Sequence, residues 1–247
     1  MKAAPLIEGP LIEARGLHSF YGESHILHGV DFAVRPGEAV GLLGRNGMGK
    51  TTLLRSLLGL TPPRRGTVRI KGVDMTGSAP HRIARQGIAF VPEGRGIFPN
   101  LSVREHLVLA ARPKRGPSRA GRAAWDLERV LETFPRLKRR LGLPGTLLSG
   151  GEQQMLTIGR ALMANPDLIV LDEATEGLSP ILAGEIWSIL RTLRQGGIAC
   201  VIVDKNFAAV SALADRCVVL VKGRVVLEGS AAGLRKKRAT LHRHLGV

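Results

Sequence analysis

The fold of this chain is decided by residues 39–51, which read AVGLLGRNGMGKT. An apolar run from Ala39 to Leu43 comes first and predicts a buried strand, and a Leu-rich stretch from Thr52 to Leu60 predicts a helix. The loop between them matches G-x-x-x-x-G-K-[ST], the phosphate-binding loop, in the strand, loop and helix order that its mechanism requires. These residues therefore predict an α/β protein that holds the phosphates of a nucleotide.

The residues of this loop each have a physical reason to meet an anion. Glycines let successive backbone N–H groups turn toward one phosphate, and the helix N-terminus adds the positive end of a dipole. A lysine in the first turn of a helix opposes that dipole unless an anion is bound, so an unliganded structural loop is disfavoured. We expect Lys50 to reach the terminal phosphates and Thr51 to ligate Mg²⁺. The predicted nucleotide contacts in this loop are Gly44, Arg45, Asn46, Gly47, Met48, Gly49, Lys50, Thr51 and Thr52.

Two adjacent carboxylates end another buried strand, which runs from Leu168 to Leu171. Taken alone, Asp172 and Glu173 could equally be two solvated acids at the end of a strand. Beside a phosphate loop, we expect Asp172 to hold Mg²⁺ and Glu173 to act as general base for an attacking water. The predicted chemistry is hydrolysis of a nucleoside triphosphate.

Composition limits the alternatives. The chain has 247 residues, is 44% hydrophobic and carries 36 Lys and Arg against 20 Asp and Glu, which excludes a disordered or collagen-like protein. The net charge of +16 favours a polyanionic neighbour, either nucleic acid, an anionic membrane surface or nucleotide phosphates. No apolar run reaches bilayer length and the first residues lack a signal-peptide pattern, so we place the protein in the cytoplasm. Cys200 and Cys217 lie in Val-rich runs and are interpreted as buried apolar side chains.

Strand and helix patterns divide the chain into four parts. Alternating patterns in residues 1–38 and 66–72 predict a small antiparallel β layer, and residues 39–98 and 165–230 predict a nucleotide-binding core with a mainly parallel sheet. Residues 99–164 show helical patterns, from Val103 to Ala111 and from Ala124 to Leu137. Residues 231–247 predict a basic C-terminal helix. Basic residues gather in 112–122, 136–140 and 235–243, either as a solvated face or as charge near an anionic leaflet.

A further motif, Leu148-Ser149-Gly150-Gly151-Glu152-Gln153, stands between the phosphate loop and the two carboxylates. In this order the three motifs resemble those of the ATP-binding-cassette ATPases. The resemblance implies a RecA-like P-loop NTPase core with an N-terminal antiparallel β subdomain and an inserted helical subdomain. It also implies a head-to-tail dimer in which Ser149, Gly150, Gly151 and Glu152 cap the ATP of the partner. We expect the small residues of this motif to open a helix with free N–H groups.

The resemblance assigns further residues along the chain. Tyr21 stands where the family places an aromatic ring that stacks on adenine, although a strand aromatic packed in the core is the alternative. Glu93 occupies the place of a family Gln that senses Mg²⁺ and the transporter, and a carboxylate can also ligate Mg²⁺. Phe98 begins the surface that would receive a membrane subunit, whereas Ser102 with Glu105 also forms a plain helix-capping pattern.

Two positions depart from the family pattern. Ser179 stands where a family Asp contributes to communication across the dimer, and Lys205 stands where a His would contact the γ-phosphate. A lysine ammonium can neutralise the γ-phosphate but cannot orient a water as an imidazole can. Three interpretations of Lys205 stay open: poor hydrolysis at this chain's own site, an electrostatic substitute beside a sufficient Glu173, or a solvent-facing lysine.

The pattern around Pro92-Glu93-Gly94-Arg95 and residues 174–180 resembles one branch, the second ATPase subunit of branched-chain or hydrophobic amino acid importers. Importers of urea or amides share it. The resemblance implies a second ATPase subunit, identical or not, two membrane permeases, a periplasmic binding protein, and a peripheral place on the cytoplasmic face of the membrane. The alternatives are a cassette that binds ATP but turns over little, and a soluble ATPase acting on nucleic acid, which the charge favours but the short length opposes.

Overall fold

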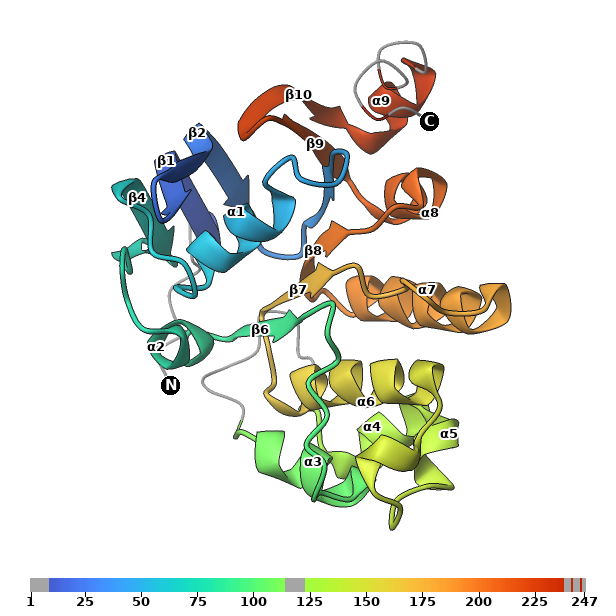
Figure 1. The fold of residues 1–247 in the computed structure, drawn as a ribbon. Helices are drawn as coiled ribbons and strands as arrows, with labels where there is room; N and C mark the ends of the chain where they lie inside the picture. The colour runs from blue at the N-terminus through green and yellow to red at the C-terminus, as the bar shows by residue number, and fades with distance from the viewer. Residues whose placement is uncertain (1–8, 114–122, 238–240, 242–244, 246–247) are drawn as a thin grey trace, which may run out of the picture.

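The computed structural model describes residues 9–113, 123–237, 241 and 245, and within them the strands form two sheets (Figure 1). The antiparallel sheet contains, in spatial order, β2 (Ser24–Val34), β1 (Ile12–Tyr21), β4 (Arg65–Ile70) and β5 (Val73–Asp74). The second sheet contains, in spatial order, β10 (Arg224–Ser230), β9 (Arg216–Val221), β3 (Ala39–Leu43), β8 (Ala199–Val203), β7 (Leu168–Asp172) and β6 (Ile88–Val91). In the second sheet β10 pairs antiparallel with β9, and the other neighbouring pairs are parallel. The predicted fold class is confirmed.

Helices cover both faces of the six-stranded sheet and fill the segment between β6 and β7. The helices are α1 (Lys50–Leu57), α2 (Pro80–Ala84), α3 (Val103–Ala110), α4 (Leu127–Thr133), α5 (Pro135–Lys138), α6 (Gly150–Met163), α7 (Pro180–Gln195), α8 (Phe207–Leu213) and α9 (Ala231–Lys236). Figure 1 shows α3 to α6 gathered below the sheet, whereas α1 lies between the two sheets. No helix in the described ranges is both long and apolar enough to span a bilayer.

The six-stranded sheet separates two apolar cores. Along β8, Val201 and Val203 pack with α1 and the antiparallel sheet, whereas Cys200 and Ile202 pack with α6, α7 and α8. This alternation is the period-two pattern of a strand covered on both faces, and it explains why the strand reads as an unbroken apolar run. The thiols of Cys200 and Cys217 are free and buried, as the sequence predicts.

Two helices differ in extent from the sequence patterns. The helix expected from 124 to 137 begins only at Leu127, because the Asp126 side chain caps it by accepting from Arg129 N. It then breaks at Phe134 (φ −122°, ψ 73°), since Pro135 has no N–H to continue the ladder. The helix after the phosphate loop spans Lys50–Leu57 and so ends before Leu60, where Gly59 adopts a φ of +72°.

The expected continuous helix over 231–247 is also interrupted. Helix α9 ends at Lys236, and Lys237 N donates to Leu234 O only three residues back, which tightens and closes the last turn. Leu241 and Leu245 are again helical, and Leu241 is buried in the core beside α8 and α9. Residues 238–240, 242–244 and 246–247, and most of the basic stretch 112–122, lie outside the described residues.

Candidate functional site

The phosphate loop is shaped by glycines that no other residue could replace without strain. Gly49, the N-cap of α1, has a φ of +98°, and Gly47 has a φ of +76°. Gly44 has a φ of +153°, and a Cβ there would lie 2.5 Å from Leu220 O on β9. The backbone of the loop therefore packs directly against β9. The N–H groups of the loop lie at the start of α1.

Lys50 points back into the loop that precedes it. Its Nζ donates to Gly44 O at 2.8 Å and to Arg45 O at 3.1 Å, and the residue is buried. Burial lowers the pKa of Lys50, although the charges of Glu173 and Asp172 partly oppose this shift. The ammonium is therefore held in the hollow of the loop, the place where terminal phosphates would meet it.

Asp172, at the end of β7, is a carboxylate with an unsatisfied oxygen. The residue is only 2% exposed, and its Oδ1 has no hydrogen-bond partner among the described residues. Burial raises its pKa, the Thr51 side chain lowers it through a hydrogen bond, and the charge of Glu93 raises it. Such a set of hydroxyl and carboxylate oxygens fits a hard cation such as Mg²⁺, which would satisfy the orphaned oxygen.

Glu173, the next residue, adopts a left-handed φ of +51°, and its N donates to Val203 O on β8 at 2.8 Å. The Glu173 carboxylate groups with those of Glu93 and Glu176, and Asp172 is not part of that group, so the two adjacent acids have different neighbours. The pKa of Glu173 is raised to about 7, chiefly by burial. A hydrogen bond with Glu176 and the negative charge of Glu176 raise it further. A carboxylate with such a pKa is suited to accept a proton near neutral pH.

Lys205 lies just after β8 and contacts the carboxylates of Glu173 and Glu176. Its Nζ lies 3.6 Å from Glu173 Oε2 and forms a closer ion pair with Glu176 Oε1. Carboxylate oxygens of Glu93, Glu173 and Glu176 lie within 4.8 Å of one another, so Lys205 neutralises part of an acidic group. The Lys205 side chain is 54% exposed and at the same time pairs with carboxylates, so all three interpretations of this residue stay open.

Glu176 is the residue of this site that sequence reasoning missed. Glu176 stands only three residues after Glu173 in the sequence. Ser179 itself caps α7, its hydroxyl accepting from Leu182 N. The signal that could have identified Glu176 is a carboxylate placed close after a strand-end glutamate, where the two acids share charge.

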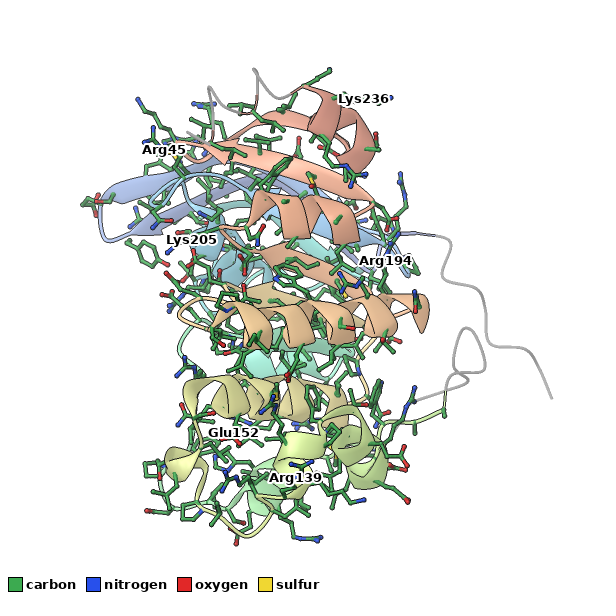
Figure 2. The ribbon with its side chains drawn as sticks, turned by 90° about the vertical axis from the view of Figure 1, so that its right-hand side faces the viewer. Arg45, Arg139, Glu152, Arg194, Lys205 and Lys236 are labelled. Carbon is green, nitrogen blue, oxygen red and sulfur yellow. The ribbon has the colours of Figure 1, made fainter. Side chains whose placement is uncertain are left out.

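The signature residues open α6 and lie apart from the phosphate loop. Figure 2 shows Arg45, Lys205 and Glu152 along one side of the molecule, with Glu152 far below Arg45 and Arg194 on the other side. Ser149 and Glu152 form a capping box: Ser149 Oγ accepts from Glu152 N, and the Glu152 carboxylate accepts from Ser149 N. The expectation of free N–H groups on the small residues of this motif is therefore wrong for Ser149, because its N–H is taken up by the Glu152 carboxylate.

The loop after Glu93 is held by the signature helix. Thr157 Oγ1 donates to Arg95 O at 2.7 Å, and Arg160 Nη1 donates to Gly96 O at 2.6 Å. The Arg160 guanidinium also lies over the Phe98 ring, 5.1 Å from its centroid, and Phe98 is 46% exposed. Arg160 on α6 therefore contacts both Phe98 and the loop after Glu93.

Two further residues lie at the ends of elements, Tyr21 on β1 and Ser102 before α3. Tyr21 is the last residue of β1 and is 45% exposed, so its ring is not packed in the core. Ser102 forms the expected capping box with Glu105 at the start of α3. The structure thus brings residues 44–52, Glu93, Asp172, Glu173 and Lys205 to one place, and keeps 149–152 separate from them.

Comparison with known proteins gives consistent matches. The sequence model described as "ABC transporter" matches residues 27–176. The chain is 40% identical to the high-affinity branched-chain amino acid transport ATP-binding protein BraG of Pseudomonas aeruginosa, over 92% of this chain and 96% of BraG. It is 37% identical to the Nod factor export ATP-binding protein I of Burkholderia orbicola, over 90% of this chain and 72% of that protein.

Solved structures show the same similarity. An ATP-binding subunit of an ABC transporter superposes with a TM-score of 0.78 at 31% identity, covering 93% of each chain. The ADP conformation of an ATP-binding cassette superposes with a TM-score of 0.72 at 26% identity, covering 90% of this chain and 91% of that one.

Proposed function

Because this chain belongs to the ABC transporter family, we propose that it is the ATPase subunit of an importer for branched-chain or other hydrophobic amino acids. Membership makes it an ABC ATPase, which binds nucleotide and couples ATP hydrolysis to transport. The observation that carries the substrate proposal is the similarity to BraG, which extends over nearly the whole of both chains. The exporter relative matches over less of its own length.

The phosphates of ATP would be held by the N–H groups of residues 44–52 and by Lys50. Lys50 Nζ already lies inside the loop, so it needs to exchange only two carbonyl acceptors for phosphate oxygens. The exposed ring of Tyr21 would stack on adenine, a contact that reads a π-face and not a base edge.

Thr51, Asp172 and Glu93 would hold Mg²⁺. Asp172 Oδ1, buried and without a partner among the described residues, supports this assignment most directly. Once bound, Mg²⁺ would neutralise charge on the terminal phosphates. The same charge would lower the pKa of Asp172 and keep that carboxylate ionised.

Glu173 would accept the proton of the attacking water. Its backbone is fixed by the hydrogen bond to Val203 O, so the carboxylate position is set by β7 and β8 together. Lys205 would move from its carboxylate partners toward the γ-phosphate when ATP binds, because that phosphate carries more charge than either acid. This transfer would free Glu173 at the moment when its proton acceptance is needed.

A second ABC ATPase subunit, identical or different, would complete each site. We assign Ser149, Gly150, Gly151 and Glu152 to the ATP that is bound by the partner, because these residues lie apart from this chain's own phosphate loop. The N–H groups of Gly150 and Gly151 are the ones left over by the capping box. Their lack of side chains would let a phosphate approach them closely.

Two membrane permeases and a periplasmic binding protein would complete the transporter, with this subunit on the cytoplasmic face of the membrane. Exposed Phe98 would contact a permease, and its stacking with Arg160 would carry that contact to α6. We propose no nucleic acid partner. We also propose the division into a β layer, a nucleotide-binding core, a helical subdomain at 99–164 and a basic C-terminal segment.

A cassette with low turnover is the second candidate, and the engagement of Lys205 by two carboxylates favours it. Reconstitution tests both candidates. The chain is purified from membranes with its associated subunits, the subunits are identified, and ATPase activity is measured in liposomes with the binding protein and either leucine or urea. Stimulation of the ATPase by leucine supports the proposal, whereas stimulation by urea would make urea or amides the substrate class. An ATPase rate that is unchanged in Glu173→Gln supports the low-turnover candidate.

A further inference from the structure

Three histidines gather on the antiparallel sheet, away from the nucleotide site. His18 lies on β1, and His25 and His28 lie on β2, each partly exposed, while the neighbouring Leu17 and Leu27 are fully buried on the opposite face. His18 and His28 are paired across the two strands. Irregular register near His18 and Phe20 allows the third histidine to approach the other two.

One nitrogen of His18 and one of His25 are close enough to share one ion, with the His28 ring beside them. His18 Nδ1 lies 3.0 Å from His25 Nε2, and the rings of His25 and His28 have centroids 3.9 Å apart. When these two nitrogens share a hydrogen bond, one of them carries the proton and donates, and the other accepts with its lone pair. Zn²⁺ bound at 2.0–2.1 Å by two nitrogens in tetrahedral geometry separates them by about 3.3 Å, so a small ring movement would admit the ion.

Neighbouring side chains pack against these rings. Burial, and then the charges of His25, Arg224 and His18, lower the pKa of His28. The Phe20 ring stacks on His25 with centroids 4.1 Å apart, and Arg64 covers Phe20. The charges of Arg64 and Arg224 oppose the approach of any cation, so the ion must be held strongly by its nitrogen ligands.

We propose that His18 and His25, with His28 beside them, form a binding site for a transition-metal ion that prefers imidazole, with Zn²⁺ as the probe. The site differs in chemistry from the carboxylate group of Glu93, Glu173 and Glu176, whose oxygens suit Mg²⁺. It also needs no nucleotide, and it stands whether or not the proposed transport substrate is correct.

A bound ion would join β1 to β2 directly before Tyr21, the end of β1. The same ribbon is linked to the phosphate loop, because His28 N donates to Gly223 O and Gly223 N donates to Met48 O. Metal binding would therefore stiffen the segment that carries the proposed adenine ring.

The test uses the untagged full chain, stripped with a chelator and dialysed against ZnCl₂ in excess MgCl₂ without nucleotide. Bound zinc is measured by elemental analysis and affinity by calorimetry. We expect one Zn²⁺ per chain, and an affinity weakened at least about tenfold in His18→Ala and in His25→Ala, since even outer-shell changes cost that much. His81→Ala, which alters an exposed histidine on α2, is the matched control and should bind as the wild type does.

A second measurement does not depend on whether the variants fold. Zinc titrated into the wild-type chain should shift the ring ¹⁵N resonances of His18 and His25 and leave that of His81 in place. Absence of bound zinc, or equal retention by all three variants, would overturn the proposal and leave an imidazole hydrogen bond as the only interaction.

Discussion

Lys205 Nζ lies 3.6 Å from Glu173 Oε2, so the proposed general base has an ammonium beside it. Glu176 acts on the same carboxylate with the opposite sign, raising the pKa of Glu173 while Lys205 lowers it. Burial is the largest cause of the raised pKa of Glu173, and these two residues, which can be changed one at a time, shift it further in opposite directions.

The first prediction concerns Glu176. Since kcat/KM reports the ionisation of the free enzyme, it should rise with pH through a midpoint near 7 as Glu173 loses its proton. Glu176→Gln removes the negative charge that raises this pKa, so the midpoint should move to lower pH. The measurement is the pH profile of ATP hydrolysis in the assembled transporter. A profile with the wild-type midpoint would show that Glu176 does not influence the base.

Lys205 gives the opposite prediction. Lys205→Met removes the positive charge that stabilises ionised Glu173, so the midpoint of kcat/KM should move above that of the wild type. The test is the direction in which the midpoint moves. The rate of hydrolysis alone is not informative, because loss of a γ-phosphate contact would also lower it. Lys222→Met, which alters a lysine in the β9–β10 turn, is the control. Equal midpoints in both variants would contradict the pairing of Lys205 with Glu173.

The third prediction separates phosphate from base recognition. Lys50→Ala should weaken ATP binding at least about 100-fold, the scale of two charge-assisted hydrogen bonds, and leave AMP affinity nearly unchanged. Tyr21→Ala should weaken ATP and AMP alike, by about 1–3 kcal/mol for a lost stacking contact. Fluorescent analogues of both nucleotides measure this. If Lys50→Ala weakened AMP as much as ATP, the lysine would not act on the terminal phosphates.

Much of the fold was predictable because local patterns and tertiary environment agree. The strand Ala39–Leu43 is apolar on both faces since both faces are covered, and the loop after it carries the glycines that its backbone requires. The break at Phe134 was not predicted, because the apolar pattern continues across Pro135 while the backbone cannot. Local periodicity describes which face is buried, but only the proline chemistry determines where the helix stops.

The sequence motifs of the candidate site could be predicted, but the contacts between its charged side chains could not. Asp172 and Glu173 were identified from a strand end, yet the role of Glu176 depends on a left-handed turn at Glu173 that folds the chain back on itself. The contact of Lys205 with both acids joins segments that follow different strands. Such contacts arise from the sheet order β8–β7, which the sequence does not state.

The fourth prediction concerns Ser149. Because Ser149 caps α6, Ser149→Ala should lower the free energy of unfolding by about 1 kcal/mol, apart from any effect on ATP. Ser149→Asn keeps a capping side chain and is the matched control. In mixed dimers both variants should impair hydrolysis at the partner's phosphate loop and leave this chain's own ATP affinity intact. Impairment at this chain's own loop instead would contradict the head-to-tail assignment.

The last prediction concerns Arg216, which joins the two sheets. Its guanidinium donates to Glu38 Oε1 at 2.9 Å, to Glu228 Oε1 at 2.6 Å and to Ala33 O on β2 at 2.6 Å, and its side chain is only 18% exposed. Arg216→Ala would leave the Glu38 carboxylate, whose side chain is only 12% exposed, without its cation, so the free energy of unfolding should fall by about 3 kcal/mol.

The matched control is Arg136→Ala. Arg136 also forms a two-bond ion pair, with Glu185, but both side chains are exposed to solvent, and water replaces a lost partner there. Its loss should cost less than about 1 kcal/mol. Urea unfolding of nucleotide-free protein measures both variants. Equal losses would mean that burial adds nothing at Arg216, and that the two sheets are held together by the apolar core around α1 alone.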